Sequence, residues 1–296
     1  MNKSGKAFYY SFLAPCLIFL LVVAIFPLIF AVVLSLQQYD LTNLASNRFV
    51  GLNNYLSMLT DKNFWSSLGR SIYFTVLSVG ISFILGFILA LILNRKDIIG
   101  NNFFRSIYLI PMILAPMVIG ATFRYMLNTD FGIINFLLSK VGLPKISFLG
   151  NSAWALNSII IVDIWQWTPF MVLVLLAGLE SLPNEPYEAA QIDGANFWQE
   201  LKYITLPFLN PVITIAILIR TMDAFRDFDK IFMMTSGGPG SSSETLSYYV
   251  WKIGFQWFQM GQGSAWGIFM LYFVIFISWL YLKTLGKQIL KGEENQ

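Results

Sequence analysis

Residues 17–34 read LIFLLVVAIFPLIFAVVL, and they lie inside a stretch from residue 7 to residue 39 that carries no charged side chain. About 20 apolar residues in a helix cross the roughly 30 Å of bilayer hydrocarbon, whereas one charge at its centre costs a few kcal/mol or more. A secretory signal has a shorter apolar segment and a small-residue cleavage site, which this long, aromatic stretch lacks. We therefore expect a retained membrane-spanning helix over residues 11–36.

Further long apolar stretches follow along the chain. Apart from Asp163, their central parts carry no charge, and each is long enough for a helical span. We therefore predict an all-α polytopic membrane protein, in which residues 1–296 form a single domain with six transmembrane helices. The five further spans are expected at 71–94, 105–126, 153–180, 207–226 and 264–284.

The composition excludes several classes of soluble protein. Hydrophobic residues make up 56% and charged residues only 12% of the 296 positions, and the mean hydropathy is +0.64; a soluble domain carries about twice that charged fraction. With no histidine and a single cysteine, the chain cannot form an internal disulfide, a histidine-based triad or a thiolate zinc site, and we expect no cofactor or metal. The net charge of +3 comes without a basic cluster, which excludes nucleic acid as a partner.

The distribution of lysine and arginine between the connections indicates the orientation. With both termini inside, the inner segments hold nine such residues and the outer segments hold eight, but the inner segments are much shorter. The density of positive charge therefore predicts that both termini are cytoplasmic, in the cell membrane of a prokaryote. The outer connections are long and rich in Asn, Ser, Gly and aromatic residues.

The one substantial inner connection is the most informative segment. Residues 183–211 read PNEPYEAAQIDGANFWQELKYITLPFLNP. Pro186 suits the first turn of a short helix, and Glu188 then lies where the helix dipole favours a carboxylate. Gly194 is a natural break before a second short helix over 197–203. We expect a helix-turn-helix along the membrane surface, with small residues at its tip for close approach to another surface.

The spacing in this connection resembles a known motif. Glu188-Ala189-Ala190 is followed after three residues by Gly194 and after nine more by Ile204, and Leu206-Pro207 completes the pattern. This resembles the EAA motif of permease subunits in binding-protein-dependent ATP-binding-cassette (ABC) importers.

Two further stretches, 39–55 and 228–255, resemble the branch of that family that imports maltose-like oligosaccharides, polyols and glycerol phosphate. The resemblance spans about residues 10–285. It implies a translocation subunit rather than an enzyme, with ATP hydrolysed on two separate ATPase subunits; the chain itself contains no G-x-x-x-x-G-K-[ST] loop. Further implied partners are a second, non-identical permease and an extracytoplasmic binding protein that delivers a sugar or polyol.

The resemblance also implies that residues 181–206 form the coupling loop, which docks in a groove on an ATPase subunit. Glu188 would meet a basic group there, the two alanines would permit close packing, and Gly194 would supply the bend. The implied coupling residues are Glu188, Ala189, Ala190, Asp193, Gly194, Ile204, Leu206 and Pro207.

Charged side chains at membrane depth are costly and usually face a cavity or a partner. Asp163 lies within DIWQWTPF in the fourth predicted span, while Arg220 and Asp223 lie three residues apart in the fifth, within pairing distance on one helix face. Sugars bind through hydroxyl hydrogen bonds and aromatic faces, which these residue types supply. The alternatives are interfacial tryptophans and a purely structural ion pair. The candidate substrate-pathway residues are Asp163, Trp165, Gln166, Trp167, Thr168, Arg220 and Asp223.

Proline and small residues predict two further features of the spans. Pro111 and Pro116, with Gly120, predict a broken or kinked helix in the third span. Small residues at the head of the sixth span would let another helix pack close; they are Gly261, Gly263, Ser264, Ala265 and Gly267.

Two other functions remain open. A secondary transporter or channel would work without an ATPase and often shows an internal repeat, of which none is convincing here. A membrane-embedded enzyme would need a convergent catalytic set, and without histidine only scattered carboxylates remain. Co-purification of an ATPase would exclude the first, and turnover of a lipid or peptide by the isolated chain would indicate the second.

Overall fold

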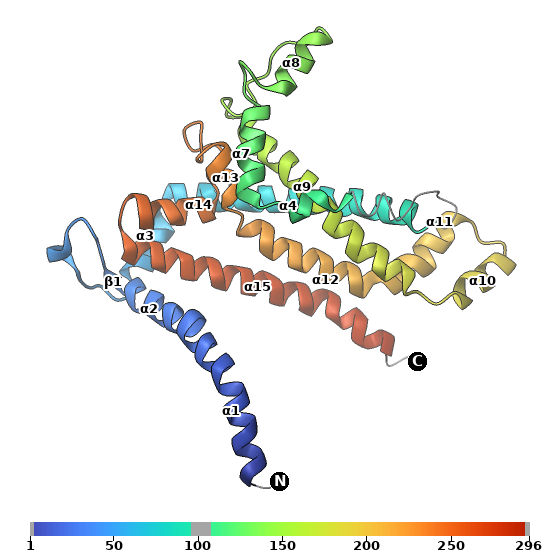
Figure 1. Ribbon diagram of the computed structural model, residues 1–296, viewed down its shortest axis with the longest axis horizontal. Coiled ribbons are helices and arrows are strands. Elements are labelled where there is room, and N and C mark those ends of the chain that lie inside the picture. Colours follow the sequence, from blue (N-terminus) through green and yellow to red (C-terminus); the bar gives the residue numbers. More distant parts are fainter. Residues whose placement is uncertain (1–2, 96–107, 294–296) are drawn as a thin grey trace. The chain divides into compact units, whose positions relative to one another are not determined.

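The computed structural model describes the backbone of residues 3–95 and 108–293 and the side chains of residues 12–95 and 108–283. Helices make up nearly all of the regular structure (Figure 1). Within these residues the strands are β1 (Gln37–Gln38) and β2 (Arg48–Phe49), which form one short antiparallel ribbon. The predicted all-α class is confirmed.

Five helical segments among the described residues are long and apolar enough to cross a membrane. The predicted third span, 105–126, begins outside the described residues, so the count of six spans stays a prediction. The five segments are α1 (Lys3–Leu20) continued by η1 (Leu21–Ile25) and α2 (Phe26–Ser35); α4 (Lys62–Leu93); α9 (Ala155–Glu180); α11 (Phe197–Glu200) continued by η3 (Leu201–Thr205) and α12 (Leu206–Phe225); and α15 (Met260–Glu293).

The described part of the third predicted span is interrupted. Helix α6 (Ile110–Ile113) ends at Leu114, and α7 (Pro116–Met126) begins two residues later. Leu114 and Ala115 are both extended, with ψ of 139° and 133°. The ring of Pro116 disfavours helical backbone in the residue before it, which accounts for Ala115. The interruption that the prolines predict is therefore present.

Shorter elements occupy the connections. They are η2 (Leu44–Ser46), α3 (Asn53–Thr60), α8 (Ile133–Lys140), α10 (Glu185–Ile192), α13 (Asp229–Met234), α14 (Leu246–Trp251) and η4 (Lys252–Gln256).

The chain divides into two compact units. The first unit comprises Met1–Trp65 and Tyr249–Phe273, and the second comprises Ser66–Tyr248 and Val274–Gln296. The expectation of a single domain stays a prediction.

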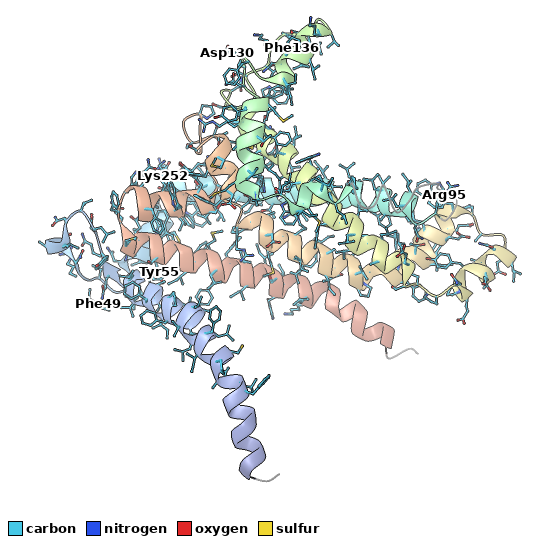
Figure 2. The ribbon with its side chains drawn as sticks, in the orientation of Figure 1. Phe49, Tyr55, Arg95, Asp130, Phe136 and Lys252 are labelled. Carbon is cyan, nitrogen blue, oxygen red and sulfur yellow. The ribbon has the colours of Figure 1, made fainter. Side chains whose placement is uncertain are left out.

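An aromatic cluster forms the core of the first unit. Phe64 and Trp266 are fully buried and meet edge to face, with ring centroids 5.2 Å apart, and Tyr249 packs on the same indole at 5.4 Å. The Trp266 Nε1–H donates to the Asn54 carbonyl at 3.1 Å, which satisfies its polar edge. Tyr55 lies beside the end of α2 (Figure 2), where its hydroxyl donates to Ser35 Oγ at 2.8 Å.

Helix α9 is the centre of the second unit. It contacts α6, α12 and α13, and α13 in turn lies along α7 (Figure 1). Buried residues occur on all sides of α9, as expected for a helix that is apolar all round. Its few polar side chains therefore need partners on the neighbouring helices.

Candidate functional site

A buried ion cluster joins three helices of the second unit. Asp163 on α9 pairs with Arg220 on α12 at 2.8 Å and with Lys230 on α13 at 2.9 Å. All three side chains are at most 1% exposed. Charges are buried at this depth only when they are paired, because an isolated ion would lose its hydration without compensation.

Further partners extend the cluster. Lys230 also pairs with Asp227, and the Ser78 hydroxyl of α4 donates to Asp163. Two cations thus face two carboxylates, so the cluster carries no net charge.

Gln166 connects the cluster to the interruption between α6 and α7. Its Oε1 accepts from Lys230 Nζ at 3.2 Å, and its Nε2 donates to the Leu114 carbonyl at 3.3 Å. Because the helix stops at Leu114, that carbonyl has lost its place in the helical hydrogen-bond ladder, and a polar side chain from a neighbouring helix satisfies it.

The Asp227 carboxyl follows α12 and lies outside the five membrane-spanning segments. Burial raises its pKa from the ordinary 3.8 to about 6; the ion pair with Lys230 opposes this shift, and the nearby Asp163 carboxylate adds to it.

A pocket of about 380 Å³ lies beside the cluster. Its wall combines two aromatic side chains with several charged groups, and the Arg220 guanidinium lies 4.8 Å from the centre of the Trp167 ring. Asp223 and Arg226 form a more exposed pair at 3.0 Å. The lining residues are Pro116, Trp167, Arg220, Asp223, Arg226, Asp227, Phe228, Asp229 and Lys230.

The structure separates the predicted substrate-pathway residues into three groups. Trp167, Arg220 and Asp223 line the pocket, and Asp163 and Gln166 are buried behind it. Trp165 is 45% exposed and packs on Phe123, while the Thr168 hydroxyl is used within α9, where it donates to the Ile164 carbonyl at 2.6 Å.

The alternative of a structural ion pair between Arg220 and Asp223 is wrong. Arg220 and Asp223 do not pair with each other. The buried Arg220 guanidinium pairs with the buried Asp163 carboxylate, whereas the more exposed Asp223 pairs with Arg226. The sequence reading also missed Ser78, Asp227 and Lys230. The spacing of three between Asp227 and Lys230 is the signal that was available for this pair.

The coupling loop has the predicted helix-turn-helix form. Helix α10 ends at Ile192, and Gly194 follows in the left-handed region with φ of 75°, a conformation that glycine adopts without steric cost. Asn196 and Gln199 then form a reciprocal capping box at the start of α11. Pro207 lies in the first turn of α12, as expected.

The motif residues lie on the surface of this loop. Glu188, Ala189, Asp193 and Gly194 are exposed, and so are the large side chains of Ile192 and Trp198, at 87% and 73%. The surface of the loop therefore presents two large apolar side chains beside its charged ones.

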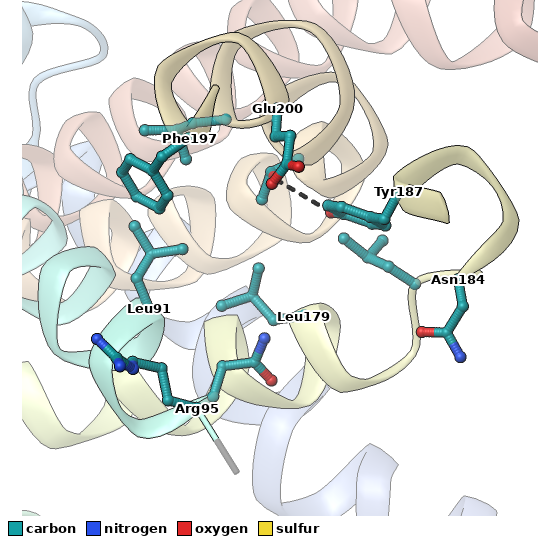
Figure 3. Close-up of a pocket in the computed structure, with 11 residues that line it drawn as sticks. Leu91, Arg95, Leu179, Asn184, Tyr187, Phe197 and Glu200 are labelled. Atoms are coloured by element: carbon teal, nitrogen blue, oxygen red, sulfur yellow. Dashed lines mark hydrogen bonds between the residues drawn. The ribbon is translucent and has the colours of Figure 1, made fainter. Parts of the chain in front are cut away.

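A second pocket, of about 300 Å³, lies between the coupling loop and the ends of α4 and α9. Figure 3 shows Leu91, Leu179, Tyr187 and Phe197 around it, together with the hydrogen bond in which the Tyr187 hydroxyl and Thr205 Oγ1 are 3.0 Å apart. This bond ties α10 to η3, so the loop is attached to the long helix that continues into α12.

Residues 82–285 match the family described as binding-protein-dependent transport system inner membrane component. The chain belongs to this family. It is therefore a transmembrane, non-catalytic subunit of a binding-protein-dependent ABC importer, a complex that includes a binding protein and ATPases. It is a multi-pass protein of the inner membrane.

Individual relatives align over almost the whole chain. The trehalose/maltose transport system permease protein MalF of Thermococcus litoralis is 38% identical over 93% of this chain and 92% of that protein. The trehalose permease protein SugA of Mycobacterium tuberculosis is 34% identical (96% and 90%), and the arabinooligosaccharides permease protein AraP of Bacillus subtilis is 32% identical (98% and 91%).

A solved structure has the same fold. The crystal structure of a bacterial ABC transporter involved in the import of the acidic polysaccharide alginate contains a chain that superimposes with a TM-score of 0.84, over 96% of both chains and at 23% identity.

Proposed function

We propose that the chain, with a second and non-identical permease, forms the pathway for an uncharged carbohydrate-like solute such as an oligosaccharide or polyol. The three relatives described above are named as permeases for trehalose and maltose, for trehalose and for arabinooligosaccharides. This shared class of solute supports the proposal.

The pocket beside the ion cluster suggests which residues contact the solute. Trp167 and Phe228 line this pocket, and aromatic rings can pack on the C–H surface of a sugar. Each of the three lining cations, Arg220, Arg226 and Lys230, already has a carboxylate partner. An anionic solute would have to compete with those carboxylates, whereas a hydroxyl group adds a hydrogen bond to a pair that stays intact. The charge balance therefore favours a neutral solute.

Asp163 and Gln166 act behind the pocket wall in this proposal. They hold Arg220 and Lys230 in place, and the solute contacts fall to Trp167, Arg220 and Asp223.

In this proposal residues 181–206 couple the permease to ATP hydrolysis. They lie on the cytoplasmic side of the membrane, as do both chain termini. Glu188 meets a basic group on one ATPase subunit, Ala189 and Ala190 permit close packing, and Gly194 gives the bend. Asp193 adds a second exposed carboxylate. Ile204, Leu206 and Pro207 connect the docked surface to α12, so closure of two ATPase subunits moves that helix.

The test is uptake by the assembled importer in proteoliposomes. With the sister permease, the ATPase subunits and the binding protein present, we expect ATP-dependent uptake of trehalose, maltotriose or arabinotriose. Uptake that continues without ATP would identify a secondary transporter or channel. Failure to take up any of the three sugars, with uptake of an anionic sugar instead, would overturn the proposed solute class.

A further inference from the structure

The first unit contains a polar pocket of about 300 Å³, whose lining shares no residue with the two pockets described above. It lies where the end of the first span and the start of the last span meet the segment around α3. Its lining is rich in side-chain amides and comprises Gln38, Tyr39, Asp40, Asn53, Asn54, Ser57, Gln259 and Gln262.

Backbone hydrogen bonds fix the walls of this pocket. Leu41 N–H donates to the Phe258 carbonyl and Gly261 N–H donates to the Tyr39 carbonyl, both at 3.1 Å. A Cβ atom at Gly261 would lie 2.0 Å from the Gln37 carbonyl oxygen, so only glycine allows the start of α15 to approach β1 this closely. The predicted close packing at the head of this helix is therefore present: Gly261 lies against the extended β1, and Gly263 lies against Gly254 of the helical segment η4, where a Cβ atom would come within 2.9 Å of the Gly254 Cα.

The residue next to the pocket has a strained backbone. Phe258 has φ of 60°, a value that is rare and strained for a bulky side chain. This conformation places Gln259 opposite Asp40, with which it forms an isolated bridge. Strain of this kind persists where the surrounding structure over-determines it, which is common at binding sites.

Several polar groups of the pocket are not used inside the protein. The Asn54 amide donates to the Ser35 and Gln37 carbonyls, and Asp40 accepts from Thr42. By contrast, the side chains of Tyr39, Asn53, Gln259 and Gln262 make no hydrogen bond to any group in the described part of the chain.

These unused groups define the chemistry of a ligand. Each amide offers two donors and one acceptor, and the phenol offers one of each. Sugar hydroxyls are donors and acceptors at once, so they match such a surface. The lining holds one carboxylate and no basic side chain, which disfavours an anionic ligand.

We propose that this pocket is a carbohydrate subsite, which holds one sugar unit of the solute at the outer ends of the first and last spans. The proposal rests on the proposed function, from which both the outward position and the neutral, polyhydroxylated ligand follow. Gln259 and Gln262 supply the main contacts from the start of α15, opposite Asn53 and Tyr39.

The test compares the double variant Gln259→Ala, Gln262→Ala with the control Gln256→Ala, which removes an exposed amide a few residues away that does not line the pocket. Both are measured as the complete importer in proteoliposomes, with binding protein loaded with maltotriose or arabinotriose. We expect the double variant to raise the half-saturating concentration for uptake about tenfold, while the control stays near the unsubstituted value. Co-purification of the ATPase subunits with each variant verifies that the complex is intact.

Three results would overturn the subsite in different ways. Unchanged uptake by the double variant, with normal uptake by the unsubstituted importer, removes the subsite and leaves the proposed function standing. The ATPase activity that sugar-free binding protein stimulates is measured as well. If the double variant lowers this stimulation as much as it lowers sugar uptake, the pocket contacts the binding protein and not the sugar. Absence of sugar uptake by the unsubstituted importer removes the proposed function and the subsite with it.

Discussion

The Asp163 carboxylate on α9 accepts a hydrogen bond from the Arg220 guanidinium on α12 at 2.8 Å, and both side chains are excluded from solvent. Removal of one partner from such a pair leaves the other charge buried without compensation, which costs more than the pair itself contributes. The pair therefore fixes the position of α12 against α9, and α12 is the helix that the coupling loop enters.

Asp163→Asn should destabilise the protein by about 3–5 kcal/mol, because Arg220 loses its carboxylate and Lys230 loses one of two. Thermal unfolding in detergent measures the effect. The matched control is Asp223→Asn, which breaks a pair that is largely solvated, with side chains 59% and 40% exposed, and which should cost less than about 1 kcal/mol. Equal losses for the two variants would contradict the structural role of the buried pair.

Gln166→Leu should cost about 1–3 kcal/mol, because it leaves the Leu114 carbonyl and part of Lys230 without a hydrogen-bond partner. Thr168→Val serves as the control, since that hydroxyl bonds only to a carbonyl of its own helix. The same unfolding measurement applies. A Gln166 variant as stable as the Thr168 variant would show that the interruption between α6 and α7 does not depend on this amide.

The stability of the protein should also depend on pH through Asp227. Because its pKa is raised from 3.8 to about 6, the folded state holds a proton between those values that the unfolded chain has released. The stabilisation that Asp227 contributes to the folded state is therefore complete below about pH 4, and it declines as the pH rises towards 6.

Asp227→Asn removes this titration while Lys230 and Asp163 still face the site. The unfolding free energy of the unsubstituted protein relative to the variant should thus fall by about 1 kcal/mol between pH 5 and pH 6. Unfolding of both proteins across that interval is the measurement, and a constant difference would be the contrary result.

The sequence predicted those features that depend on local pattern. Charge-free stretches indicated the long apolar helices, and the order of Pro186, Gly194 and Pro207 indicated the helix-turn-helix form around Gly194, because caps and breaks act within a few residues. The partners of Asp163 depend instead on long-range packing. Lys230 reaches Asp163 only because α13 packs against α7 and α9. No local sequence pattern predicts this packing. The ion pair between Asp163 and Arg220 also explains why Arg220 and Asp223 do not pair, although their spacing of three residues allows it.

Gly194→Pro should separate the importer from its ATPase subunits. Proline holds φ near −65°, which is incompatible with the φ of 75° at this position. The matched control is Gly142→Pro, which makes the same change at a glycine with φ of 79° after α8, outside the loop. Co-purification of the ATPase subunits should be lost in the first variant and kept in the second. Loss in both would indicate general misfolding, and retention in both would contradict docking through this turn.

Glu188→Lys tests the charge of the same docking surface. The side chain is exposed in the first turn of α10, so reversal of its charge should leave the protein in the membrane at normal abundance while it abolishes ATP-dependent uptake. Uptake that survives the change would contradict a contact with a basic group of the ATPase.

Ala189→Phe tests close packing without any change of charge. Ala189 is exposed on α10, and a large ring there would hold the partner surface away while it disturbs nothing inside the chain. Gln191→Phe places the same ring on the same short helix, two residues further on and therefore about 200° around its axis. If α10 seats in a groove through its Ala189 face, the first variant should lose ATPase co-purification and uptake together, and the second should retain most of both. Equal retention would mean that α10 does not approach the ATPase through this face, even if the loop as a whole is required for transport.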